Sequence, residues 1–176
     1  MIKKETILAL ATSTILVSGT VNAASPGHGT VTFTGSIINA PCSITPDTID
    51  QTVNLGQISY KMLASDGMSP PRSFQIKLEN CDVTALADKT VTAMFTGTES
   101  TLRPGYLAIQ GTASGASIAI TADNGKNITL GQIAPATVIQ DNNNTLRFAA
   151  YLHGSRKERV LPGEFTSVAN FTLAYQ

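Results

Sequence analysis

The chain has 176 residues, of which 12 are basic and 12 are acidic, so its formal net charge at neutral pH is zero. A neutral chain without a basic stripe lacks the electrostatic footprint of nucleic-acid binders, so no nucleic-acid partner is expected. Aromatic residues make up only 6% of the chain, tryptophan is absent and there are 14 glycines. This composition favours one β-rich, turn-rich domain over a solvated helical bundle.

The first 23 residues have the pattern of a secretory signal peptide. A charged start with Lys3 and Lys4 precedes an apolar stretch at residues 6–17 and a small-residue cleavage motif, Val-Asn-Ala, at residues 21–23. A membrane anchor is the alternative, but spanning needs about 20 apolar residues and polar residues interrupt this run. We therefore expect an exported mature chain that begins at Ala24.

Short runs with a period of two follow along the mature chain, separated by Gly, Pro, Asn and Asp. Residues 123–126, Asp-Asn-Gly-Lys, predict a hairpin with a type I′ turn, because Asn-Gly tolerates positive φ at both central positions. One helical turn is expected at residues 60–64. The predicted strands are residues 30–38, 52–58, 73–80, 90–96, 116–122 paired with 127–130, 145–153 and 163–176.

The last predicted strand, residues 163–176, reaches the end of the chain. Chain termini usually fray unless a sheet holds them, so this strand needs a partner. One face of the strand carries Phe165, Ser167, Ala169, Phe171, Leu173 and Tyr175.

The chain has two cysteines, Cys42 and Cys81, and an even pair in an exported protein predicts a disulfide. The bond would close a loop of about 40 residues, for which the chain-entropy estimate is about 4 kcal/mol. A redox or metal pair is the alternative, but it lacks C-x-x-C spacing and a nearby histidine. Seven or more short strands and one disulfide predict an all-β, immunoglobulin-like sandwich, although an antibody-type domain would carry a tryptophan between its cysteines.

The sequence does not match the catalytic and cofactor-binding motifs that we considered, so we expect no enzyme activity, no cofactor and no metal site. His28 and His153 are the only histidines, and neither a G-x-S-x-G elbow nor an H-E-x-x-H motif occurs. Residues 141–144 lack the glycine and closing glutamate of an EF-hand. Residues 156–159, Arg-Lys-Glu-Arg, mix both signs of charge and are expected to form an exposed loop.

Three segments in order resemble the subunits of chaperone-usher pili (fimbriae) of Gram-negative bacteria. Residues 29–42, GTVTFTGSIINAPC, resemble the family's segment before its first cysteine, and residues 74–81, FQIKLENC, resemble the segment that carries the second. The ending Gly163-x-Phe165-x-x-x-Ala169-x-Phe171-x-x-x-Tyr175-Gln176 resembles the family's C-terminal signature. The segments that flank the cysteines look closest to P-type rod subunits, with type 1 rod subunits next.

This resemblance implies an incomplete immunoglobulin-like domain at residues 36–176 that lacks its last strand, preceded by a donor-strand arm at residues 24–35. In the family, the arm of the next subunit fills the gap by strand addition. A complete sandwich that folds onto its own arm is the alternative. The residues implied to donate are Gly27, Gly29, Val31, Phe33 and Gly35; those implied to form the groove and to bind the chaperone are Gly163, Phe165, Ala169, Phe171, Leu173, Tyr175 and Gln176.

The partners implied by the resemblance are a periplasmic pilus chaperone, an outer-membrane usher and neighbouring subunits in a head-to-tail polymer. The expected function is a structural subunit of a surface fimbria that supports cell adhesion by polymerising through donor-strand exchange. A minor adaptor or a terminating subunit are the alternatives. A carbohydrate-binding tip adhesin would need an additional lectin domain, for which about 153 mature residues leave no room.

Overall fold

The computed structural model describes residues 28–176. It divides into two units, Met1–Ile37 and Ile38–Gln176. The predicted signal peptide and Gly27 lie outside the described residues. Within residues 28–37 the side chains are exposed and form no strand, so the strand predicted at residues 30–38 is wrong for this state of the chain. A strand requires ladder hydrogen bonds with a neighbour, and in the described part of the chain these residues have none.

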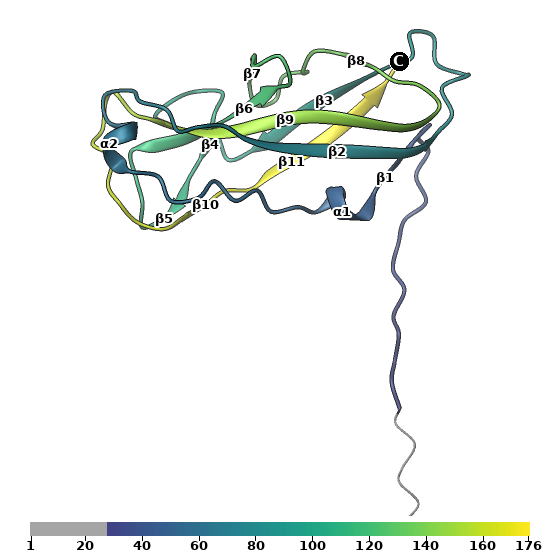
Figure 1. The fold of residues 1–176 in the computed structure, drawn as a ribbon, viewed down its shortest axis with the longest axis horizontal. Coiled ribbons are helices and arrows are strands. Elements are labelled where there is room, and N and C mark those ends of the chain that lie inside the picture. The colour runs from purple at the N-terminus through teal and green to yellow at the C-terminus, as the bar shows by residue number, and fades with distance from the viewer. Residues whose placement is uncertain (1–27) are drawn as a thin grey trace, which may run out of the picture. The chain divides into compact units, whose positions relative to one another are not determined.

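The larger of the sheets in the second unit is antiparallel, in the order β1-β2-β9-β6-β4, with β7 added to β6 (Figure 1). Its long central pair joins β2 to β9, with Phe74 opposite Phe148 and Ile76 opposite Leu146. The strands are β1 (Ser43–Ile44), β2 (Arg72–Cys81), β4 (Leu107–Ala108), β6 (Ala116–Ala122), β7 (Asn127–Ile128) and β9 (Asn142–Gly154).

The opposing layer contains a three-stranded sheet in the order β11-β3-β8 and a separate short pair, β10 with β5. In the register of the longer pair, Phe171 of β11 lies opposite Phe95 of β3. The strands are β3 (Thr90–Gly97), β5 (Gln110–Gly111), β8 (Thr137–Val138), β10 (Phe165–Thr166) and β11 (Ala169–Tyr175).

The core lies between the two layers. Phe95 of β3 makes edge-on contacts with Phe148 of β9 and Phe74 of β2, with ring centroids 5.0 and 6.1 Å apart. Apolar residues at alternate positions, such as Ile76 and Leu78, are fully buried, as expected for the inner face of a sandwich. The chain is an all-β, immunoglobulin-like sandwich, and the predicted fold class is confirmed.

Four predicted strands are confirmed as β2, β3, β6 and β9, and the predicted helical turn is α2 (Tyr60–Leu63). A second short helix, α1 (Pro46–Ile49), was not predicted. Among the described residues, no helix is long and apolar enough to cross a membrane.

The predicted hairpin between β6 and β7 is confirmed, but its predicted type I′ turn is wrong. Gly125 has a φ of 75°, whereas Asn124 does not have a positive φ. The amide of Gly125 donates to Ala122 O, and the amide of Ala122 donates to Lys126 O, both at 2.9 Å. Asn124 instead accepts a hydrogen bond from the amide of Lys126 through its side chain, which stabilises a three-residue loop closed by a left-handed glycine.

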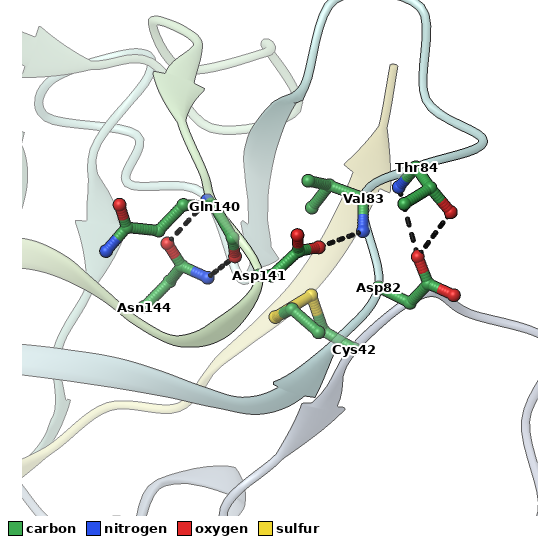
Figure 2. Close-up of a disulfide and its surroundings, with 8 residues drawn as sticks. Cys42, Asp82, Val83, Thr84, Gln140, Asp141 and Asn144 are labelled. Atoms are coloured by element: carbon green, nitrogen blue, oxygen red, sulfur yellow. Dashed lines mark hydrogen bonds between the residues drawn. A yellow bond between two sulfur atoms is a disulfide. The ribbon is translucent and has the colours of Figure 1, made fainter.

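The predicted disulfide joins Cys42 to Cys81 and ties the start of the domain to the end of β2 (Figure 2). Beside it, Asp141 accepts a hydrogen bond from the amide of Val83 at 3.0 Å, and Asp82 accepts two from Thr84. Because the amide of Asp82 also donates to Pro41 O at 2.9 Å, the chain is held firmly where it enters the domain.

Candidate assembly groove

A groove of about 1260 Å³ runs along the edge of the sandwich within the unit Ile38–Gln176. One wall is the segment of residues 49–60, which connects α1 to α2, and the other is residues 162–171, which include β10 (Figure 1). The floor is made of core side chains from both layers: Phe74, Phe95, Leu107, Ile118, Ile120 and Leu152. The groove therefore opens directly onto the hydrophobic core.

The groove stays open because β11 has only one strand neighbour in the part of the chain that the structure describes. Along one edge it pairs with β3. On the other side, residues 52–58 form no strand, so the strand predicted there is wrong. Asn54 accepts a hydrogen bond from the amide of Gly56 at 2.8 Å, and Gly56 has a φ of 80°. This local turn interrupts the extended backbone that a ladder with β11 requires.

The last strand is also interrupted, so the prediction of one continuous strand over residues 163–176 is wrong. The chain leaves β5 after Thr166 and joins β3 at Ala169. Ser167 fixes this crossing, because its hydroxyl donates to Ala108 O at 2.7 Å. A Cβ at Gly97 would lie 2.7 Å from Val168 O, so the close approach needs glycine on β3.

The predicted residues of the last strand divide into two groups. Gly163, Phe165, Ala169 and Phe171 line the groove. Leu173 and Tyr175 pack half-buried against the core farther along β11, and Gln176 exchanges backbone hydrogen bonds with Thr90, each 2.9 Å long. Burial raises the pKa of the Tyr175 hydroxyl, in keeping with this packing. Sequence reasoning missed Val168 and the wall at residues 49–60, which also line the groove.

The chemistry of the groove suits an apolar, extended segment. The charged residues in its lining are Asp50 and Glu164, and both are exposed. Both histidines, His28 and His153, lie outside the lining. Within residues 28–176, no cluster of three or more His, Cys, Asp or Glu side chains could hold a metal ion.

The predicted donor residues belong to the other unit, Met1–Ile37. Val31 is 74% exposed and Phe33 is 89% exposed, although side chains of these types are usually buried. Both alternate with threonines along the chain. Gly29 and Gly35 have open space where a Cβ would lie. The described part of the chain thus contains an apolar groove in one unit and, in the other unit, a segment with exposed apolar side chains.

The family model described as fimbrial protein matches residues 31–176. The chain belongs to this family, and the resemblance found in its sequence is confirmed. The chain is 56% identical to the Fimbria A protein of Serratia marcescens, and the alignment covers 91% of each chain. It is 52% identical to the major MR/P fimbria protein of Proteus mirabilis strain HI4320, over 92% of this chain and 91% of that protein.

Among solved structures, the chain is similar to the P pilus rod subunit PapA, with a TM-score of 0.70 and 33% identity. That alignment covers 78% of this chain and all of the other. These relatives are structural pilins, so the chain is a structural subunit of a cell-surface fimbria and not an enzyme. It polymerises with other pilus subunits.

Proposed function

We propose that the chain polymerises by donating its residues 24–35 to the groove of a neighbouring subunit, which completes that subunit's sandwich. The observation that supports this most strongly is the apolar groove of about 1260 Å³ beside an edge strand with one strand partner among the described residues. We further propose, from the sequence pattern and the family resemblance, a signal peptide at residues 1–23, a donor-strand arm at 24–35 and an incomplete domain at 36–176.

The dimensions of the arm match those of the groove. From Gly27 to Gly35 an extended chain spans eight steps, or about 26 Å at roughly 3.3 Å per residue. The groove wall at residues 162–171 spans nine steps, or at most about 30 Å, because the interruption between β10 and β11 shortens it. One arm is therefore long enough to run along the groove, with Gly27, Gly29, Val31, Phe33 and Gly35 on the side that faces the core.

The energetic gain comes from burial and from strand pairing. Transfer of Val31 and Phe33 from water into the groove contributes about 1.5–3 kcal/mol for each side chain. Backbone hydrogen bonds along the free edge of β11 add to this, as in other cases of strand addition. Since the donor arm and the acceptor groove are different surfaces, the contact does not close on itself and propagates a filament.

A groove of this size needs cover before a neighbour arrives, because a large exposed apolar surface promotes aggregation. We propose that a periplasmic chaperone supplies a strand to the groove and that its basic residues bind the terminal carboxylate of Gln176, which is exposed. An outer-membrane usher then receives the complex, and the growing fibre supports cell adhesion. The two proposed partners follow the family resemblance.

The test compares the mature chain alone with the same chain carrying a second copy of residues 24–35 after Gln176. We expect the extended chain to be a soluble monomer, because the added copy fills its own groove, and the mature chain alone to aggregate. Size-exclusion chromatography with light scattering measures both. Equal solubility and equal monomer content for the two chains would refute the incomplete domain.

A further inference from the structure

A cluster of charged side chains joins four segments at one end of the domain. Asp66, in the loop after α2, accepts hydrogen bonds from Arg103 and from Arg156, the latter from Nε at 2.6 Å. Nε2 of His153 lies 3.3 Å from the same carboxylate. The Asp66 side chain is only 15% exposed and that of His153 only 10%. One carboxylate thus links the loops after α2 and β3 to the end of β9 and the loop that follows it. We call Asp66, Arg103, His153 and Arg156 together the clamp.

The backbone around Asp66 holds the loop after α2 close to β9. Asp66 has a left-handed φ of 70°, and the next residue, Gly67, would bring a Cβ to 1.8 Å from Met62 O. The amide of Gly154 donates to Gly67 O at 2.9 Å, and a Cβ on Gly154 would lie 1.8 Å from Leu63 O. The loop after α2 therefore packs closely against the end of β9. This packing brings Asp66 within hydrogen-bond distance of Arg103 and Arg156.

The segments on either side of the Asp66–Arg156 bond, α2 and the chain after β9, also contribute to the groove. Tyr60 and Leu63 of α2 line the groove, and so do Val160 and Leu161, which follow β9. Asp66 lies three residues after Leu63, and Arg156 lies four residues before Val160. The bond from Arg156 to Asp66 consequently ties together two chain segments that both contribute residues to the groove lining.

We propose that Asp66 is a positioning residue that sets the spacing between the groove-lining residues Leu63 and Val160, and that this slows release of the segment bound there. The inference rests on the proposed function, because it concerns the groove that receives the arm. Asp66 itself does not line the groove and acts through Arg156 and Arg103.

The charges in the cluster support this role. Partial burial raises the pKa of Asp66, but the hydrogen bond from Arg156 and the charges of Arg103, Arg156 and His153 outweigh it and hold that pKa below its ordinary value. The groups that face His153 are Asp66, Arg103 and the rings of Tyr106 and Tyr151, whose centroids lie 5.8 and 6.2 Å away. Protonation of His153 adds a positive charge beside that of Arg103, while Asp66 is the one carboxylate in the cluster. Acid therefore weakens the clamp.

The experiment uses fibres isolated from cells that express the full chain with Asp66→Asn. Asparagine has the same shape and tolerates a left-handed φ, so the substitution removes mainly the charge. The matched control is Asp47→Asn, since Asp47 pairs with Lys77 at 2.7 Å but is 59% exposed and lies outside the groove lining. We expect fibres with Asp66→Asn to dissociate in denaturant about tenfold faster or more, and control fibres to stay within about threefold of the parent.

Hydrogen exchange on the same fibres separates positioning from general destabilisation. We expect faster exchange at residues 60–67 and 155–161 with little change at 169–175, whereas a purely structural role would raise exchange throughout. Arg156→Gln is the second variant, because the Arg156 side chain is 77% exposed and we expect the fold to tolerate its replacement. It should reproduce part of the effect and add little to Asp66→Asn.

Equal dissociation of Asp66→Asn and control fibres, or uniform exchange, would overturn the clamp. Deletion of residues 24–35 separates this failure from failure of the proposed function. If the deletion stops fibre growth while Asp66→Asn behaves like its control, the donor arm stands and only the clamp is wrong. If fibres grow without the arm, the proposed function itself fails.

Discussion

Phe171 of β11 lies opposite Phe95 of β3, with their ring centroids 6.4 Å apart. Phe95 is buried in the core against Phe148, whereas Phe171 is half-buried and lines the groove. This pair is the point at which the core of the domain becomes the wall of the groove. A strand that enters the groove therefore extends the existing core and does not bind to a separate surface.

The first prediction concerns this wall. Phe171→Asp should abolish fibres, because an unpaired carboxylate would be buried when a strand fills the groove. Thr172→Asp is the matched control, since Thr172 is the next residue on β11 and its side chain is exposed. Electron microscopy of cells that express each variant measures the number of fibres. Abundant fibres with Phe171→Asp would show that the groove is not the assembly surface.

The second prediction concerns the arm. Phe33→Asp should stop fibre growth while the subunit still accumulates in the cell, because the change leaves the residues of the domain untouched. The control is Thr32→Asp, on the outward face of the proposed donor strand. Immunoblots of surface and periplasmic fractions compare the two variants. Loss of surface fibres with both variants, or with neither, would contradict the assigned face of the arm.

The third prediction concerns the disulfide, whose cysteines are 39 residues apart in the chain. Replacement of Cys42 and Cys81 by alanine together should lower the free energy of unfolding by about 4 kcal/mol in the chain-entropy model. Urea unfolding of the subunit with its own arm appended, followed by circular dichroism, measures the loss. An unchanged midpoint would mean that the bond does not stabilise the domain.

The fourth prediction concerns acid. Burial first, and then the charge of Arg103, lower the pKa of His153 below its ordinary 6.5, and Asp66 only partly offsets them. The unfolded chain therefore takes up a proton on this histidine at a higher pH than the folded chain does, so stability falls as the pH drops below about 6.5. Thermal unfolding at a series of pH values should show this fall, and His153→Gln should reduce it. An equally steep fall in the variant would assign the effect to other groups.

Alternation along the chain was enough to predict the long strands β2, β3, β6 and β9, because each has one face in a continuous core. It failed at residues 52–58, where Val53 and Leu55 alternate as in a strand, but the Asn54–Gly56 turn breaks the backbone. It also failed at Ser167, whose bond to Ala108 divides the last strand. Both failures depend on a side chain that bonds to the backbone, which period-two patterns do not reveal.

Part of the candidate site was likewise predictable. Phe165 and Phe171 were expected to form the groove from the C-terminal pattern, and they line it. The opposite wall at residues 49–60 was not, because it has no regular structure between α1 and α2. No sequence pattern pointed to Asp66, because its proposed role depends on ion pairs with Arg103 and Arg156. These residues are distant in sequence and come together only in the fold.

An electron cryomicroscopy map of the fibre, at a resolution that shows side chains, would locate the donor arm directly. If donor-strand exchange joins the subunits, residues 24–35 of one subunit run between β11 and residues 49–60 of its neighbour, with Val31 and Phe33 directed into the core. A map in which each arm lies in the groove of its own subunit, or in which the groove is left unfilled in the fibre, would contradict donor-strand exchange.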